Sequence, residues 1–393
     1  MIGLVVNPVA GVGGPAGLAG SDGADVQRLA VSRGARSRVQ ERTALALSVL
    51  AAQHPGLVVA TAEGEMGADA VRAAGLVPCV VYAAAGTSSA RTPGSARTTD
   101  AVDTQRAVAA VAAAGADLVL VVGGDGTLRD AAAGLGADAH ETAERMPAVL
   151  GIPAGVKMYS PVFAVSPRAA GALAADWVAR GGLPTADREV LDIDEAAMRR
   201  ARVDPALYGM LRVPYLAGRT QARKAATPAS EAAAVEAAAR GAVARMRPGI
   251  RYLLGPGGTT AEIARQLGIE GSPLGVDVIL DGAVVVRGAS EQELLAEIAR
   301  GPARAVVTVI GGQGFLLGRG NQQLSASVLR ALGDDPMLVV APEQKLIDLL
   351  GRPLLVDTGD LDLDARLAGH VRIVTGVGTS SLYAVSAPEL TPV

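Results

Sequence analysis

Residues 117–122, with the sequence DLVLVV, form an apolar run of strand length that leads directly into the motif GGDGT at residues 123–127. A continuous apolar strand of this kind is typical of a parallel sheet that is covered on both faces. Similar runs alternate with helical patterns in the first half of the chain, with strands expected at 2–6, 57–60, 77–82 and 149–152 and helices at 41–53, 103–114 and 166–180. Asp103 or Thr104 would cap the helix at 103–114. The alternation predicts an α/β fold with a doubly wound parallel sheet.

The pattern changes after residue 155. Strands of mixed polarity follow, and Asp281-Gly282 indicates a hairpin turn with antiparallel pairing. We therefore expect an α/β domain at 1–155, a β-rich domain at 156–335 with a helical insertion near 219–251, and a strand-helix-strand segment at 336–393 that packs back on the first domain. The basic residues of the insertion form either a solvated helix face or a rim that attracts anions: Arg219, Arg223, Lys224, Arg240, Arg245, Arg247 and Arg251.

Composition excludes several classes of protein. Of the 393 residues 50% are hydrophobic and 19% charged, so the chain can bury a large core. A net charge of −3 and only 2% aromatic residues argue against a nucleic-acid partner. Cys79 is the only cysteine and there are three histidines, which argues against a disulfide and against a cysteine- or histidine-rich metal site. Without a signal-like start or an apolar run of roughly 20 residues, we expect a cytoplasmic protein with no membrane partner.

The motif GGDGT is the strongest indication of chemistry. Ligands bind where strands of a parallel sheet end, and glycines there expose backbone N–H groups without a Cβ in the way. The helix expected to begin near Leu128 presents its positive end to the same place. These features predict a phosphate cradle. Phosphates repel a carboxylate, so we expect Asp125 to have a chemical role at this position. It either binds magnesium or accepts a proton from an attacking hydroxyl. The alternative is a tight turn that only caps a helix.

Other nucleotide and hydrolase motifs are weak or absent. The chain has no G-x-x-x-x-G-K-[ST] and no G-x-S-x-G. Gly11, Gly13 and Ala16 match G-x-G-x-x-A, but the acid expected about 20 residues later does not follow. We therefore expect a glycine-rich loop near a ligand rather than a dinucleotide fingerprint.

With these motifs the chain resembles the ATP–NAD kinase family, which is related to the diacylglycerol and sphingosine lipid kinases. GGDGT follows an apolar strand, GIPAG at 151–155 lies where the family has G-I-N-x-G, and GPGGTTA at 255–261 is similar to its T-P-T-G-S-T-A. The segments GLVVNPVAGVGG, IPAGVKMYSPVFAVSP and GGQGFLLGRGNQQ resemble a bacterial and archaeal branch of polyphosphate- or ATP-dependent NAD kinases that includes proteins similar to the acetoin-catabolism X protein.

The resemblance implies a role for each matching residue. Asp125 would be the catalytic aspartate, at an ordinary pKa of about 3.9, with Gly123, Gly124, Gly126 and Thr127 binding phosphate. Residues 1–155 would bind the phosphate donor, and residues 156–335 would bind NAD through Gly257, Gly258, Thr259 and Thr260. Glu189, in Arg188-Glu189, is the nearest match to the family's Asn-Glu pair, and Pro153 replaces the Asn of G-I-N-x-G.

For several polar residues the sequence leaves two interpretations open. Lys157 could hold a donor phosphate or lie on the surface. Asp22 and Asn7 could face the cleft or form turns, and the turn is favoured for both. The polar residues of 311–323 could contact phosphate or a sugar, or form a subunit contact: Gln313, Arg319, Asn321 and Gln322.

The leading hypothesis is a kinase that transfers a phosphoryl group from ATP or polyphosphate to the 2′-hydroxyl of the adenosine ribose of NAD, giving NADP. Magnesium would accompany the donor, and the resemblance implies a homo-oligomer. One alternative is a kinase for another hydroxyl metabolite or a lipid, although Leu128-Arg129-Asp130 replaces the Asn-Glu pair with which lipid kinases continue the motif. The other is a nucleotide-binding regulator without catalysis.

Overall fold

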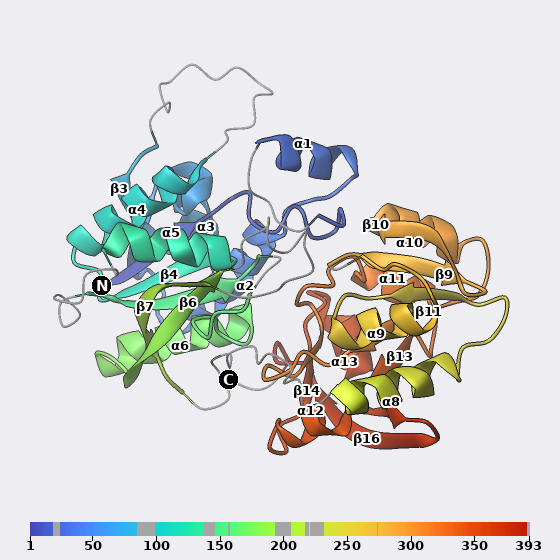
Figure 1. Cartoon of the computed structure of the whole chain (residues 1–393). Helices are drawn as coiled ribbons and strands as arrows, with labels where there is room; N and C mark the ends of the chain where they lie inside the picture. The colour runs from blue at the N-terminus through green and yellow to red at the C-terminus, as the bar shows by residue number, and fades with distance from the viewer. Residues whose placement is uncertain are drawn as a thin grey trace.

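The computed structural model describes residues 1–18, 24–84, 99–136, 146–155, 158–192, 206–216, 220, 232–272 and 274–390. Two sheets form the centres of two domains that lie side by side (Figure 1). No helix of the described residues is both long and apolar enough to cross a membrane.

The first sheet is parallel throughout, as the apolar runs predict. Its five strands in spatial order are β3 (Val77–Tyr82), β2 (Val58–Ala62), β1 (Ile2–Val6), β4 (Leu118–Gly123) and β5 (Ala148–Pro153). The helices of this domain are α1 (Ala24–Ser32), α2 (Val39–Gln53), α3 (Ala68–Ala73), α4 (Ala101–Ala113), α5 (Asp125–Leu135) and α6 (Pro167–Arg180), with a 3₁₀ turn at Gly64–Met66. The helices α4 and α5 pack together on one face, and α2 and α6 on the other (Figure 1). Both faces are therefore covered, which explains why β4 is buried at every position.

The helix α4 begins earlier than its sequence indicates. Its N-cap is Asp100, not Asp103 or Thr104. The Asp100 side chain accepts a hydrogen bond from Asp103 N, and the Asp103 side chain accepts one from Asp100 N. This reciprocal pair satisfies N–H groups that have no partner in the first turn, so Asp103 completes the cap from inside the helix.

The first domain extends beyond residue 155. The hairpin of β6 (Thr185–Asp192) and β7 (Ala206–Pro214) packs on β5 and α5. Apolar side chains of the hairpin, among them Val190, Leu211 and Val213, are buried in the same core as β4. The expected boundary at 155/156 is therefore too early, because α6 and the hairpin can bury their apolar faces only against the first sheet.

The second sheet has nine strands in the order β10-β9-β8-β11-β13-β15-β16-β14-β12. They are β8 (Arg251–Leu254), β9 (Val276–Leu280), β10 (Ala283–Ala289), β11 (Ala303–Thr308), β12 (Phe315–Leu317), β13 (Met337–Val340), β14 (Leu354–Val356), β15 (Gly369–Gly376) and β16 (Thr379–Ser386). The strands β8, β11 and β13 are parallel neighbours, whereas β8–β9 and β9–β10 are antiparallel. The turn between β9 and β10 has positive φ at both Asp281 (50°) and Gly282 (80°), as the predicted hairpin requires.

Helices cover both faces of the second sheet. Val306 of β11 is buried on the side of α8 (Ala232–Val243) and α9 (Gly258–Gln266). Val307, the next residue, is buried on the side of α10 (Glu291–Ile298), α11 (Ala326–Ala331) and α13 (Leu361–Leu367). Successive side chains of a strand point to opposite faces, so the central strands need apolar residues at every position. The short helix α12 (Glu343–Ile347) follows β13.

The C-terminal segment contacts the first domain through loops. Its strands β13–β16 complete the second sheet, which corrects the expectation that 336–393 packs on the first domain as a strand-helix-strand unit. The loop 357–359 accepts hydrogen bonds from Arg38, the N-cap of α2, and from Arg42, and the Glu389 carboxylate accepts one from Arg168 N of α6. The strand β13 pairs with β11 on one side and with β15 on the other, which places the C-terminal strands in the second sheet.

A buried ion cluster joins the two domains. The Asp357 carboxylate accepts hydrogen bonds from Arg42 Nη1 at 3.0 Å and Arg319 Nη1 at 2.7 Å. Arg42 belongs to α2 and also donates to the carbonyl of Pro153, whereas Arg319 stacks over the Phe315 ring in the second domain. Burial alone would raise the pKa of Asp357, but the two guanidinium groups outweigh it and hold that pKa well below its usual range. The Asp357 carboxylate thus binds one arginine from each domain.

The polar segment 311–323 forms an interdomain contact. Gln313 Nε2 donates to the carbonyl of Met158 at 2.9 Å, and Gln322 Nε2 donates to that of Gly155 at 3.2 Å. Arg319 Nη2 reaches the carbonyl of Val165 at 3.0 Å. Asn321 instead holds its own segment, donating to Leu316 O. The first-domain partners of Gln313, Arg319 and Gln322 are therefore backbone carbonyls.

Candidate active site

Asp125 is the first residue of α5, directly after β4. Its N-cap, Gly124, gives no side-chain cap, so the first N–H groups of the helix have no partner from a cap. Asp125 is 1% exposed, and its carboxylate faces the protein rather than bulk water. The helix begins three residues before Leu128 because the glycines accommodate the turn.

The segment that follows β5 covers the Asp125 carboxylate. Oδ2 accepts a hydrogen bond from Tyr159 N at 2.5 Å, and Oδ1 accepts from Ser160 N at 3.0 Å and Ser160 Oγ at 2.7 Å. Burial raises the pKa of Asp125 to about 7, although the hydrogen bonds from Ser160 and Tyr159 act to lower it. The ordinary pKa expected from the sequence is therefore wrong for this environment, because desolvation disfavours the charged form.

The residues next to Asp125 are held by polar contacts to neighbouring strands. Asn7, at the end of β1, donates from Nδ2 to Thr127 Oγ1 at 3.1 Å while its Oδ1 accepts from Val9 N. Asn7 therefore forms a local turn through Val9 N, as expected, and also contacts the GGDGT motif through Thr127. Arg129 Nη1 pairs with Asp192 of β6 at 2.8 Å, so the residue that departs from the lipid-kinase pattern fixes the hairpin.

Close packing requires glycine at two positions of this site. A Cβ at Gly155 would lie 2.2 Å from the Gly124 Cα, and one at Gly11, where φ is +73°, would lie 2.2 Å from the Ala154 carbonyl oxygen. The three loops after β1, β4 and β5 therefore touch through their backbones. The structure brings the glycine-rich loop at 11–16 to the carboxyl edge of the sheet, next to GGDGT.

Gly155→Ala tests this packing. The added Cβ must displace the Gly124 turn, so we expect at least a tenfold loss of activity and about 1–3 kcal/mol lower free energy of unfolding. Kinetic assays and denaturant unfolding measure the two effects. Wild-type activity in this variant would show that the 123–125 turn tolerates displacement.

The second predicted loop lies at the carboxyl edge of the other sheet. Gly257 is the N-cap of α9 with φ of +141°, and Thr259 and Thr260 are each 1% exposed. Thr260 Oγ1 donates to the Gly257 carbonyl at 2.8 Å. Lys345, on α12, extends its Nζ to within 3.5 Å of Thr259 Oγ1.

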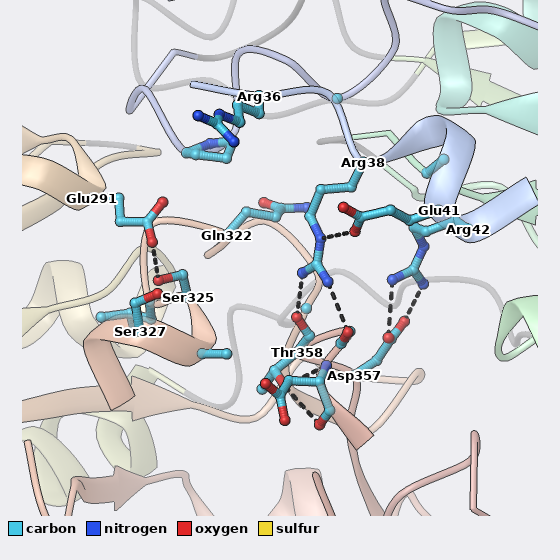
Figure 2. Close-up of a pocket in the computed structure, with 18 of the residues that line it drawn as sticks. Arg36, Arg38, Glu41, Arg42, Glu291, Gln322, Ser325, Ser327, Asp357 and Thr358 are labelled. Carbon is cyan, nitrogen blue, oxygen red and sulfur yellow. Dashed lines mark hydrogen bonds and ion pairs between the residues drawn. The ribbon is translucent and has the colours of Figure 1, made fainter. Parts of the chain in front are cut away.

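The carboxyl edges of the two sheets meet at the domain interface. Gln313, in the loop after β11, contacts Met158, the residue before Tyr159. A cavity of about 580 Å³ lies beside this contact and is lined by both domains, including Gly11, Gly155 and Met158 from the first and Gln322 and Ser325 from the second. Figure 2 shows Arg38 and Arg42 reaching across it to Thr358 and Asp357. Asp125 is not among the residues that line the cavity.

The remaining predicted site residues are only partly placed. Glu189 lies half-buried on β6, opposite Met210 of β7. Lys157 and Asp22 fall outside the described residues, as do Arg219, Arg223 and Lys224 of the insertion. In the rest of the insertion, Arg240 pairs with Glu236 and Arg251 with Glu297. No group of three or more His, Cys, Asp or Glu within the described ranges is arranged to hold a metal ion.

Comparison with known families identifies both domains. The N-terminal domain of ATP-NAD kinases matches residues 2–182, and the C-terminal domain of ATP-NAD kinases matches residues 247–385. The chain belongs to the ATP-NAD kinase family. No curated protein and no solved structure matches it. The N-terminal match includes α6, in agreement with a first domain that extends beyond residue 155. Membership of the ATP-NAD kinase family supports a kinase-like protein.

Sequence reasoning missed two residues of this candidate site. Ser160 contacts Asp125, 35 residues away in sequence. Lys345 lies 86 residues from Thr259. Neither belongs to a motif at fixed spacing, so only the fold brings them to the loops. Expected from the sequence to contact a ligand or a subunit, Gln313 contacts Met158 instead.

Proposed function

We propose that this protein is a kinase that transfers a phosphoryl group from ATP or polyphosphate to the 2′-hydroxyl of the adenosine ribose of NAD. The observation that carries the proposal is the Asp125 carboxylate, buried with a pKa of about 7 at the start of an uncapped helix, in a chain of the ATP-NAD kinase family. A general base is most effective when its pKa lies near the working pH. Asp125 is suited to that task.

The donor phosphates would lie at the N-terminus of α5. Gly123, Gly124, Gly126 and Thr127 offer backbone N–H groups there, and the helix dipole favours an anion. A side-chain cap would compete with a phosphate, and Gly124 provides none. Magnesium, bound to the donor, would neutralise its charge during transfer. Lys157 would add a point charge.

NAD would occupy the cleft between the domains, with Gly257–Thr260 on one side and Glu189 on the other. The cavity beside Gly155 and Met158 has the size of a small-molecule site, but its lining includes neither Glu189 nor residues 257–260, so the proposed position of NAD rests on the resemblance of the loops and not on this cavity. In the reaction the 2′-hydroxyl oxygen forms a bond to the γ-phosphorus, the bond from phosphorus to the ADP oxygen breaks, and the hydroxyl proton passes to Asp125. Asp125 is 1% exposed and is covered by the segment of Tyr159 and Ser160, so a hydroxyl reaches the carboxylate only when this segment moves aside.

The pH dependence of the reaction tests the role of Asp125. The base is active when deprotonated, so kcat/KM should rise about tenfold per pH unit below pH 7 and level off above it. The Ser160 hydroxyl lowers the pKa of Asp125. Ser160→Ala should therefore move the acidic limb to higher pH, whereas Ser48→Ala, on the exposed side of α2, should leave it in place. A profile that is flat from pH 5.5 to 8 would remove Asp125 as the base.

The function itself is tested with purified protein, labelled ATP or polyphosphate, magnesium and a panel of acceptors. Transfer of label to NAD supports the proposal. Transfer only to another alcohol would identify a different kinase of the superfamily. Binding of nucleotide without transfer to any acceptor would favour a regulator.

A further inference from the structure

Three parallel neighbours of the second sheet, β8, β11 and β13, end at the same edge. The turn after β8 leads into α9, a helix of nine residues. Its N-cap is Gly257, with no side-chain cap and no acidic residue in the first turn. The first N–H groups of α9 therefore lack a partner from the cap and carry the positive end of the helix dipole.

A buried hydroxyl lies beside this turn. Thr308, the last residue of β11, is 7% exposed, and its Oγ1 has no hydrogen-bond partner among the residues that the structure describes. A Cβ at Gly257 would lie 2.6 Å from Thr308 Cγ2, so the Thr308 side chain sits directly against the turn. A buried polar group without a partner is costly, and a bound ligand is one way to satisfy it.

A buried cation completes the group. Lys345, in the helix that follows β13, is 9% exposed, and its Nζ lies 3.5 Å from Thr259 Oγ1 in the first turn of α9. The ends of β8, β11 and β13 thus place the N-terminus of α9, the Thr308 hydroxyl and the Lys345 ammonium group near one another. From the same edge, the loop after β11 contacts Met158 through Gln313, and Met158 precedes Tyr159, whose N–H donates to Asp125.

We propose that Lys345, Thr308 and Thr259 form, with the N-terminus of α9, a phosphate-binding site of the second domain. Backbone N–H, hydroxyl and ammonium donors around one position match the several oxygens of a phosphate group. The inference rests on the proposed function for its ligand, a phosphate of a nucleotide in the cleft. Both NAD and ATP carry such groups, and the experiment distinguishes them.

The test measures binding without catalysis. Inorganic pyrophosphate, NAD and ATP are titrated separately into wild type, Lys345→Met and Lys345→Arg. Lys345→Met should weaken pyrophosphate and one of the two nucleotides at least tenfold, and that nucleotide is the one whose phosphate the site holds. Lys345→Arg should restore part of the affinity. Gln344→Met, at the exposed neighbour on α12, should bind as wild type.

Thr308→Val separates a ligand site from a structural role. Removing an unsatisfied buried hydroxyl should raise the unfolding midpoint without ligand, while pyrophosphate binding weakens severalfold. Unchanged affinity of both Lys345→Met and Thr308→Val for all three probes would overturn the inference, even if the wild type phosphorylates NAD. Conversely, Lys345-dependent pyrophosphate binding by a wild type that transfers no phosphate to NAD would support the site and reject the proposed function.

Discussion

Asp125→Asn is expected to abolish phosphoryl transfer to NAD while the protein remains folded. The amide cannot accept the hydroxyl proton, and a positioned general base contributes roughly 10²–10⁴-fold to a rate. Initial rates at saturating donor and acceptor measure the loss, and circular dichroism checks the fold.

Asp100→Asn is the matched control, since it removes a carboxylate of the same domain and Asn caps a helix as well as Asp. This variant should retain wild-type rates. A rate of more than about a tenth of wild type in Asp125→Asn would be too high for loss of a general base, and Asp125 would have no part in the proton transfer.

Asp357→Ala is expected to give the largest loss of stability. It leaves Arg42 and Arg319 buried without the carboxylate that they share, and removing one partner of a buried ion pair costs about 3–5 kcal/mol. Because the cluster spans both domains, their relative placement should loosen as well. Denaturant unfolding followed by circular dichroism and by the fluorescence of Trp177, the only tryptophan, measures the change.

Asp335→Ala is the control for this stability effect. Asp335 pairs with Arg304, but its side chain is 79% exposed, so the pair is worth about 0–1 kcal/mol. A loss of less than about 1 kcal/mol in Asp357→Ala would mean that water or neighbouring acids compensate the two guanidinium groups.

The fold of the first domain could be predicted where the information is local. The run at 117–122 and its glycine turn determine a buried strand and a helix start without reference to the rest of the chain. The strand at 77–82 matches the observed β3. The hairpin β6–β7 and the C-terminal strands could not be placed, because their short apolar patterns fit either sheet and only long-range packing decides between them.

The candidate site could likewise be predicted where the information is local, and not where it depends on long-range contacts. GGDGT, Gly155 and the 257–260 turn lie at strand ends that the sequence already indicated. The pKa of Asp125 could not be predicted, because it depends on burial and on hydrogen bonds from Tyr159 and Ser160, which come from another loop. The polar residues of 311–323 suggested a ligand or a subunit, and three of them, Gln313, Arg319 and Gln322, donate to backbone carbonyls of the other domain.

The most direct test of the account is the position of the transferred phosphate. Purified protein is incubated with NAD, magnesium and γ-labelled ATP, or with labelled polyphosphate, and the product is examined by phosphorus NMR and by an NADP-specific dehydrogenase. The account predicts label on the 2′-oxygen of the adenosine ribose, formed by wild type and not by Asp125→Asn. Label on any other hydroxyl, or equal product from both proteins, would contradict it.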